Sequence, residues 1–452
     1  MEFIEESGPI PPEYHRFFGS RTGLVTGLSL TPPGRGEPQA YVSAANGPKL
    51  HVLRDGLESD PGLRTGGKAV DPDDVLVRGI GETCERYAQH FPDPSRIETG
   101  TYEERAREGR VVPFEYLTVW KRANGEENVE SDPRPGDGSD PRPGDGSDPR
   151  PGDGSVLPPL SRDTTMPWTA GVDLLTGESV SVPAELVWSG VGGLVDLPPR
   201  FVDTSSGCAA GECIEDALLG GLTEVIERDG FMRTWLIRET PPAVDLGQFP
   251  TLGRFLGEFL PDRNQSVHLF QFDTAVDVPA VGAALLDDLD RRPAFVTGGS
   301  AGIDIEAAAL DALAETAQSW QYVKSLHAFE DPEIPSVEDQ IMNLDDNVLL
   351  YAEPENFEHV SFLTEGKPAR IDTVAPPGST KETLKAVLES LDEADCTPIA
   401  VDITPPDIGE VGVSVVNVFV PELLPLSLPA LPPSEHPSLS GVDVTSLPHP
   451  YP

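Results

Sequence analysis

Residues 205–231 read SSGCAAGECIEDALLGGLTEVIERDGF, in which small residues lead into an apolar run. The apolar side chains recur at helical spacing, which predicts a long packed helix: Ile214, Ala217, Leu218, Leu222, Val225 and Ile226. The helix ends in an unusual way, with Glu224, Glu227 and Arg228 close together. At about 100° per residue these two glutamates fall beside the apolar stripe, so the pattern places charge near a buried boundary.

The same ending occurs earlier in the chain. Residues 81–87 read GETCERY, which sets Glu82, Glu85 and Arg86 in the same relative order. Residues three apart share a helix face, so each motif projects two carboxylates in neighbouring directions. A third helix offers Glu315 and Gln318 at this spacing.

The remaining elements indicate a mixed fold. The first helix is expected over 70–91, capped by Asp71 with Pro72 at its first position. Its apolar stripe is expected to be formed by Leu76, Ile80, Cys84 and Tyr87. The third helix is expected over 302–323, capped by Asp304. Strands are expected over 266–274, 278–286, 291–299, 398–404 and 413–420, with another helix over 381–394. This order lacks a regular βαβ alternation, which favours α+β architecture with layered sheets and packed helices over a doubly wound sheet.

We expect three regions in the chain. Residues 1–60 form an N-terminal segment, 61–430 a catalytic domain, and 431–452 a proline-rich tail. An insertion over 125–160 contains a threefold octapeptide repeat of Ser, Asp, Pro, Arg and Gly at 131–155. Such a segment has too little apolar surface to offset its ordering entropy, which predicts a disordered loop.

The charge of the chain excludes some functions. Its 452 residues include 76 acidic and 32 basic ones, for a net charge of −44. Nucleic-acid binding is not expected, because the sequence lacks the basic footprint that phosphates require. The acidity is spread along the chain, which indicates a halophilic source. The start of the chain lacks a signal peptide, and no window is apolar enough for a membrane span, so a cytoplasmic location is expected.

The four cysteines, Cys84, Cys208, Cys213 and Cys396, fit a reducing compartment better than a disulfide framework. Cys208 and Cys213 have no second Cys or His pair at finger spacing, so we favour buried structural thiols over a metal site.

Paired carboxylates near a buried boundary repel each other, and a divalent cation would relieve that repulsion. Mg²⁺ prefers oxygen ligands and often binds carboxylates together with nucleotide phosphates, which Arg86 and Arg228 could contact. The alternative is ordinary helix-surface chemistry, since Glu and Arg are good helix formers. The stretch RTGGKAV, residues 64–70, lacks the spacing of a phosphate-binding glycine loop.

Four stretches resemble the successive blocks of the YcaO-domain family: GETCERYAQHF, WTAGVDLLTGESVSVPAELV, SSGCAAGECIEDALLGGLTEVIERDGF and GSAGIDIEAAALDALAETAQSW. The resemblance covers most of residues 20–430. It implies a YcaO-type ATP-binding fold and an ATP-dependent enzyme that phosphorylates a peptide amide oxygen, with ATP and Mg²⁺ as cofactors. By this resemblance Mg²⁺ would be held by Glu82, Glu85, Glu224 and Glu227. The other members of the nucleotide pocket would be Arg86, Ser206, Arg228 and Gln318. Arg78, Ser206 and Trp320 stand where the family often has serine, asparagine and arginine.

The chain ends in SLPHPYP, with Pro448, Pro450 and Pro452 alternating. This ending resembles the tail of the azoline-forming cyclodehydratases of the family, whose C-terminal carboxylate reaches the active site. Pro452 is therefore the expected catalytic residue, and the alternative is a disordered tail.

The resemblance implies a cyclodehydratase that makes thiazolines and oxazolines from Cys, Ser and Thr of a ribosomally made precursor peptide. The expected partners are that peptide and a separate leader-peptide-binding protein of the E1-like, ThiF-like kind, with a homodimer left open. A thioamide-forming enzyme of the same family and a non-catalytic scaffold are the alternatives.

Overall fold

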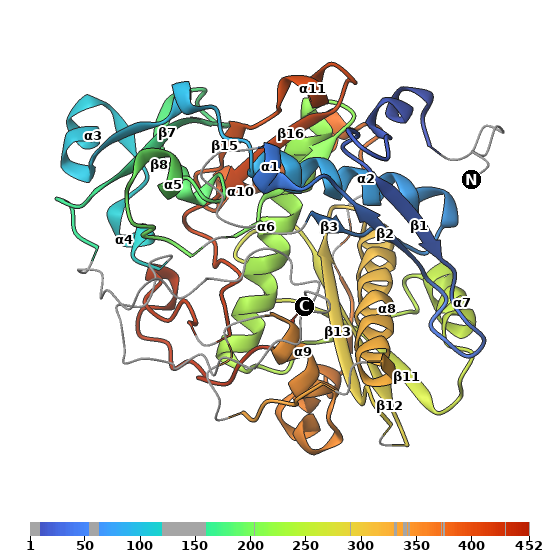
Figure 1. Ribbon diagram of the computed structural model, residues 1–452. Helices are drawn as coiled ribbons and strands as arrows, with labels where there is room; N and C mark the ends of the chain where they lie inside the picture. Colours follow the sequence, from blue (N-terminus) through green and yellow to red (C-terminus); the bar gives the residue numbers. More distant parts are fainter. Residues whose placement is uncertain are drawn as a thin grey trace.

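Helix α6 (Ile214–Ile237) runs through the middle of the molecule and packs against two different sheets (Figure 1). This computed structural model describes residues 10–53, 63–119, 160–202, 204–289, 291–329, 332–337, 341, 344–371, 373, 376–429 and 431–451. The predicted repeat at 131–155 and the expected catalytic residue Pro452 lie outside the described residues.

The larger sheet lies on one side of α6. Its described strands follow the order β6, β8, β7, β15, β16, β9, with β5 paired to β7. Their bounds are β5 Glu98–Thr101, β6 Arg110–Val111, β7 Thr165–Asp173, β8 Ser179–Pro183, β9 Cys208–Gly211, β15 Ile399–Asp402 and β16 Ser414–Phe419. Helix α6 packs on β16 and β9, so the small residues before the helix belong to the sheet that it covers.

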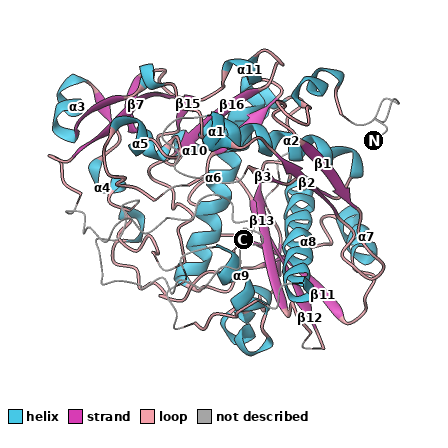
Figure 2. Cartoon of the chain, viewed as in Figure 1, coloured by secondary structure: helices cyan, strands magenta, loops and turns pink. Residues whose placement is uncertain are grey.

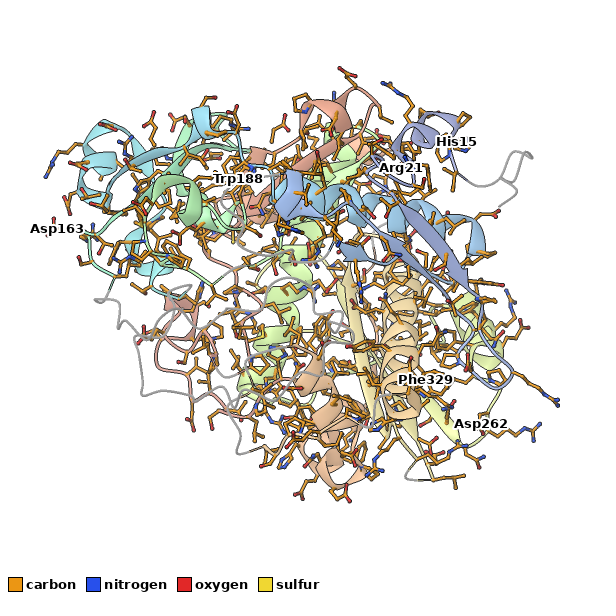
Figure 3. The ribbon with its side chains drawn as sticks, in the orientation of Figure 1. His15, Arg21, Asp163, Trp188, Asp262 and Phe329 are labelled. Carbon is orange, nitrogen blue, oxygen red and sulfur yellow. The ribbon has the colours of Figure 1, made fainter. Side chains whose placement is uncertain are left out.

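The second sheet lies on the other side of α6. Its order in the described residues is β13, β12, β11, β10, β14, so β13 lies at one edge. The bounds are β10 Ala243–Val244, β11 Gln265–Gln271, β12 Ala280–Asp287, β13 Phe295–Ala301 and β14 Pro368–Ala369. Helix α8 (Ile305–Phe329) packs along β12 and β13 and ends at Phe329, whose side chain is exposed (Figure 3).

A small sheet of β1 Gly27–Thr31, β2 Tyr41–Asn46, β3 Arg64–Thr65 and β4 Lys68–Ala69 contacts helix α2 (Pro72–Gln89). Helix α2 also packs on β9, so the two helices that carry the glutamate motifs both contact that strand. The other described helices are α1 Leu50–Leu53, α3 Tyr102–Glu108, α4 Phe114–Leu117, α5 Gly192–Val195, α7 Pro250–Phe259, α9 Leu344–Ala352, α10 Thr380–Glu393 and α11 Pro406–Gly409. Figure 2 shows these helices distributed around the sheets, and the expected α+β architecture is confirmed.

Several local predictions are also confirmed. The Asp71 side chain accepts a hydrogen bond from Asp73 N at 2.9 Å, and Asp304 caps α8 by accepting from Glu306 N and Ala307 N. Every expected strand over 266–299 and 398–420 is present. The expected apolar stripe of α2 is confirmed at Ile80 and Cys84, which are buried. It is wrong at both ends, where Val75 and Ala88 are buried and Leu76 and Tyr87 are only partly buried.

The prediction of buried cysteines is wrong for Cys213. Cys84, Cys208 and Cys396 are buried, but Cys213 is exposed. The reason is its position at the N-cap of α6, where its Sγ lies 3.0 Å from Asp216 Oδ2 in the first turn.

The C-terminal segment contributes to the core that surrounds α6. Leu439 and Tyr451 belong to the same apolar cluster as Phe231 and Trp235 of α6 and Phe295 of β13. The region boundaries at 60 and 430 stay predictions. No helix in the described ranges is both long and apolar enough to cross a membrane.

Candidate active site

Each glutamate motif holds the backbone of the segment that contains β9 through one carboxylate. Glu224 Oε2 accepts from Gly207 N at 3.0 Å, and Glu85 Oε1 accepts from Ala210 N at 2.8 Å. Gly207 has φ +82°, and a Cβ there would lie 2.0 Å from Val418 O, so glycine is required at this position. The backbone N–H groups of the small residues in 205–211 therefore bind one carboxylate from each helix, Glu85 from α2 and Glu224 from α6.

Glu82 and Glu85 share a hydrogen bond but differ in ionisation. Burial would raise the pKa of Glu82, but Arg86, whose Nε donates to Glu82 Oε1 at 2.9 Å, brings that pKa below its ordinary value. For Glu85, burial and the charge of Glu82 raise the pKa well above the ordinary range. This pair holds one firmly ionised carboxylate beside one that is costly to ionise.

Arg228 lies between the two glutamates of α6. Its Nη2 is 3.4 Å from Glu224 Oε1, and its Nη1 is 3.3 Å from Glu227 Oε1. Burial raises the pKa of Glu224, and Arg228 offsets this only in part. Burial also raises the pKa of Glu227 to about 8, with Arg228 opposing and Glu315 reinforcing the shift.

The carboxylate of Glu315 comes from α8 and joins this group. It accepts from Gly299 N at 2.7 Å on β13 and forms an ion pair with Lys68 of β4. The charges of Lys68 and Arg228 outweigh burial and lower the pKa of Glu315. Gln318 lies one turn further along α8, beside Gly66. Its Nε2 is 3.5 Å from the point that a Cβ on Gly66 would occupy.

Tyr451 reaches the same place from the C-terminal end of the described chain. Its hydroxyl lies 2.5 Å from Glu227 Oε1 and 3.1 Å from Glu315 Oε2, and its ring lies 4.8 Å from the Arg228 guanidinium carbon. Burial and the two carboxylates raise the pKa of Tyr451 well above its ordinary value, which keeps the hydroxyl protonated.

Ser206 lines a small hollow beside Arg228, together with Thr204 and Asn417. Within the described part of the chain, Arg228 Nε and Asn417 Nδ2 are buried without a hydrogen-bond acceptor. Buried donors in proteins are normally paired, so these two groups suit an anionic ligand such as a phosphate.

The expected site residues therefore come together, with one exception. Seven of the sequence-derived residues lie on α2, α6 or α8 and one, Ser206, precedes β9, while Pro452 lies outside the described residues. The sequence analysis missed Lys68, Asn417 and Tyr451. Lys68 lies inside the stretch RTGGKAV, which was considered only as a phosphate loop.

Two departures from the family pattern lie away from the carboxylates. Arg78 Nη1 forms an exposed ion pair with Asp311 Oδ1 at 2.6 Å, which joins α2 to α8. Trp320 is 2% exposed and packs with Val323 and Leu349. Both side chains have a structural role in this chain.

The donor set fits Mg²⁺ and nucleotide phosphates. The described residues contain no ready cluster of three or more His, Cys, Asp or Glu around one point. The carboxylates instead form pairs, in which Glu85, Glu224 and Glu227 have raised pKa values because excess negative charge is buried. Hard divalent cations offset such charge through oxygen ligands, and the unpaired N–H of Arg228 could donate to a phosphate oxygen.

Comparisons with known proteins agree with this arrangement. The family model described as "YcaO cyclodehydratase, ATP-ad Mg2+-binding" matches residues 66–424. An uncharacterized protein in the tfuA 3' region of Rhizobium leguminosarum bv. trifolii is 34% identical over 167 residues, and one from Methanothermobacter thermautotrophicus is 30% identical over 158 residues. Each match spans 34% of this chain, with 39% and 40% of the respective relatives.

Solved structures show the same fold. YcaO from Methanopyrus kandleri bound with AMPPCP and Mg²⁺ is 23% identical with a TM-score of 0.58, over 88% of this chain and 86% of that one. A heterocyclase in complex with substrate and cofactor is 22% identical with a TM-score of 0.67, over 95% of this chain and 55% of that one. The E. coli microcin synthetase McbBCD complex is 14% identical with a TM-score of 0.55, over 88% of each chain. ATP and Mg²⁺ are confirmed as the cofactors of this family, and because the family model covers most of the sequence, the chain belongs to the YcaO family.

Proposed function

We propose that this chain is an ATP-dependent cyclodehydratase that forms thiazoline or oxazoline rings from Cys, Ser or Thr of a ribosomally made precursor peptide. The observation that supports this most is that glutamates of both motifs meet at the β9 segment, where Glu85 and Glu224 accept from backbone N–H groups, beside an arginine, Arg228, whose buried Nε lacks an acceptor. This arrangement suits a nucleotide triphosphate, while the described site residues include no Ser or Cys held by a basic side chain as a nucleophile.

The reaction uses the substrate's own side chain as the nucleophile. A thiol or hydroxyl attacks the carbon of the preceding amide, and the amide oxygen becomes an oxyanion. That oxygen takes the terminal phosphoryl group of ATP, and ADP is released. The C–O bond then breaks and phosphate carries the oxygen away, while the thiol or hydroxyl proton and the amide proton are lost as the C=N bond forms.

The residues of the chain supply positioning and charge. Glu82, Glu85, Glu224 and Glu227 would hold Mg²⁺, which when bound neutralises the charge of the triphosphate. Arg228 would donate to a phosphate oxygen through its unpaired N–H. Arg86 keeps Glu82 ionised and in place through its hydrogen bond. Ser206 and Gln318 are proposed to line the nucleotide pocket.

The tail and the partners belong to the same proposal. Pro452 remains the proposed catalytic carboxylate, supported by the burial of Tyr451 directly before it. We also propose a peptide substrate and a separate leader-binding protein, since the heterocyclase neighbour was solved with substrate and McbBCD is a multi-protein complex.

The test combines the protein with Mg-ATP, a precursor peptide encoded beside its gene and the neighbouring leader-binding protein. Mass spectrometry should show the loss of one water mass per ring, and phosphate should be released in equal amount. The Glu224→Gln variant should form no rings. A folded wild-type protein that hydrolyses no ATP under these conditions would support a scaffold, and a gain of sulfur by the peptide would support thioamide formation.

A further inference from the structure

The last described residues, 447–451, run through the core as an extended segment, called here the tail segment. Side chains of α6 and α9 donate to its carbonyl oxygens: Trp235 Nε1 to Leu447 at 3.1 Å, Tyr351 Oη to Pro448 at 2.5 Å, and Asn347 Nδ2 to His449 at 2.7 Å and to Tyr451 at 2.8 Å. The end of the described chain lies beside α6 and β13 (Figure 1), where Tyr451 contacts Glu227 and approaches Gly299. The tail segment is therefore bound in the way a protein binds an extended peptide.

The sequence of the tail segment suits this burial. Pro448 and Pro450 have no backbone N–H, so only Leu447, His449 and Tyr451 have backbone donors that must be satisfied there. The Tyr451 N–H donates to His449 Nδ1 at 3.3 Å, and His449 Nε2 lies 2.7 Å from Ser427 O. Burial lowers the pKa of His449 to about 4, so the ring is neutral at neutral pH and adds no charge beside Arg228.

The contacts of the tail segment determine where the hydroxyl group of Tyr451 lies. Tyr451 is completely buried, and Phe231 packs 4.2 Å from its ring centre. Its hydroxyl lies between Glu227 of α6 and Glu315 of α8. The negative charge of Glu315 disfavours a second negative charge on Glu227. Gly299 of β13 leaves room for it, because a Cβ on Gly299 would lie 2.6 Å from the Tyr451 oxygen.

We propose that Tyr451 is a positioning residue that sets the separation and orientation of Glu227 and Glu315. Its hydroxyl bridges the two carboxylates by donating its single proton to Glu227 Oε1 at 2.5 Å while lying 3.1 Å from Glu315 Oε2. The side chains that hold the tail segment fix that hydroxyl in place. The bridge keeps Glu227 aimed toward Arg228 and prepared for a cation. The tail segment would thus act on the nucleotide site through a side chain, separately from any role of Pro452. This inference rests on the proposed assignment of Glu227 to the Mg²⁺ site.

The test compares Tyr451→Phe with Tyr87→Phe. The first variant keeps the buried ring and removes only the hydroxyl, while the second removes a tyrosine hydroxyl that donates to Asp407 at 3.0 Å outside the site. Calorimetry with Mg²⁺ and a non-hydrolysable ATP analogue measures binding without turnover. Because the lost hydroxyl no longer holds Glu227 and Glu315 in place, Tyr451→Phe should weaken binding by about 10-fold or more. Tyr87→Phe should bind as the wild type does, and in turnover Tyr451→Phe should raise KM for Mg-ATP by more than it lowers kcat.

Equal affinity of Tyr451→Phe and wild type would overturn the inference. If Tyr451→Phe does not fold, Gly299→Ala replaces it, because the added methyl group must displace the hydroxyl, and unchanged binding there would be equally decisive. Glu227→Gln, measured in parallel, distinguishes a wrong Mg²⁺ assignment from a wrong positioning role for Tyr451. Normal binding by Glu227→Gln would remove the proposed Mg²⁺ site itself, whereas weak binding by Glu227→Gln with normal binding by Tyr451→Phe would remove only the positioning role.

Discussion

Helices α2 and α6 carry the same five-residue motif in two different surroundings. In both, the arginine pairs with the first glutamate: Arg86 with Glu82 at 2.9 Å and Arg228 with Glu224 at 3.4 Å. The second glutamates differ. Glu85 accepts from the backbone of β9, whereas Glu227 meets side chains from α8 and the C-terminal segment.

This difference shows what a local motif can specify. The spacing of the glutamates and the arginine determines that they share a helix face. It also determines that the arginine lies four residues after the first glutamate, within reach of an ion pair. The ionisation of each glutamate depends on groups that are distant in sequence. Glu82 has a lowered pKa because of Arg86 and Lys68, while Glu227 has a raised one because of burial and Glu315.

The largest expected effect tests what the two motifs have in common. Replacing any one of Glu82, Glu85, Glu224 or Glu227 by Gln should lower Mg-dependent ATP turnover by at least about 100-fold, because each loss removes a ligand worth several kcal/mol to the reaction. Phosphate release by the purified variants measures this, and circular dichroism confirms folding. Wild-type turnover in a folded Glu227→Gln protein would contradict the metal assignment.

A smaller effect tests the ionisation of Glu227 on α6 by pH. The folded-state pKa of Glu227 is raised from 4.5 to about 8, so the folded protein binds this proton more tightly than the unfolded chain does. Stability should therefore fall as pH rises from about 4.5 to about 8 in the presence of a chelator. Thermal unfolding across this range should show a steeper fall for wild type than for Glu227→Gln. Parallel curves would mean that Glu227 is already ionised in the folded protein without metal.

The smallest effect compares the two glutamates of α2. Glu85→Gln should leave the free energy of unfolding unchanged or slightly higher, because a neutral amide suits this site and its oxygen can still accept from Ala210 N. Glu82→Gln should lower it by about 1 kcal/mol, because Arg86 loses a charged partner in a site that is only partly screened. Urea unfolding of the two variants without metal measures the difference. A larger loss for Glu85→Gln would reverse our assignment of which carboxylate is ionised.

Much of the architecture follows from short-range patterns. Asp71 and Asp304 mark helix starts, the apolar periodicity marks α6, and the strands from β11 to β13 follow from their composition. The motifs also indicate which faces of α2 and α6 carry charge. These features depend on residues within a few positions of each other, which a sequence displays directly.

The partners of the carboxylates could not be predicted in this way. Lys68 and Glu315 are 247 positions apart and meet only because β4 and α8 pack together. Tyr451 could not be placed because nothing in the proline-rich tail sequence shows which side chains will hold its carbonyl oxygens. Cys213 was predicted to be a buried thiol, but its position at the N-cap of α6 exposes it.

The central claim is that the site activates a peptide amide oxygen with ATP. The most direct measurement uses a precursor peptide whose reacting backbone carbonyl carries a heavy oxygen isotope, incubated in ordinary water with Mg-ATP, the protein and its leader-binding partner. The account predicts that the heavy oxygen appears in the released phosphate, one atom for each ring formed. Ring formation with the heavy oxygen recovered in water, and phosphate free of the label, would contradict it.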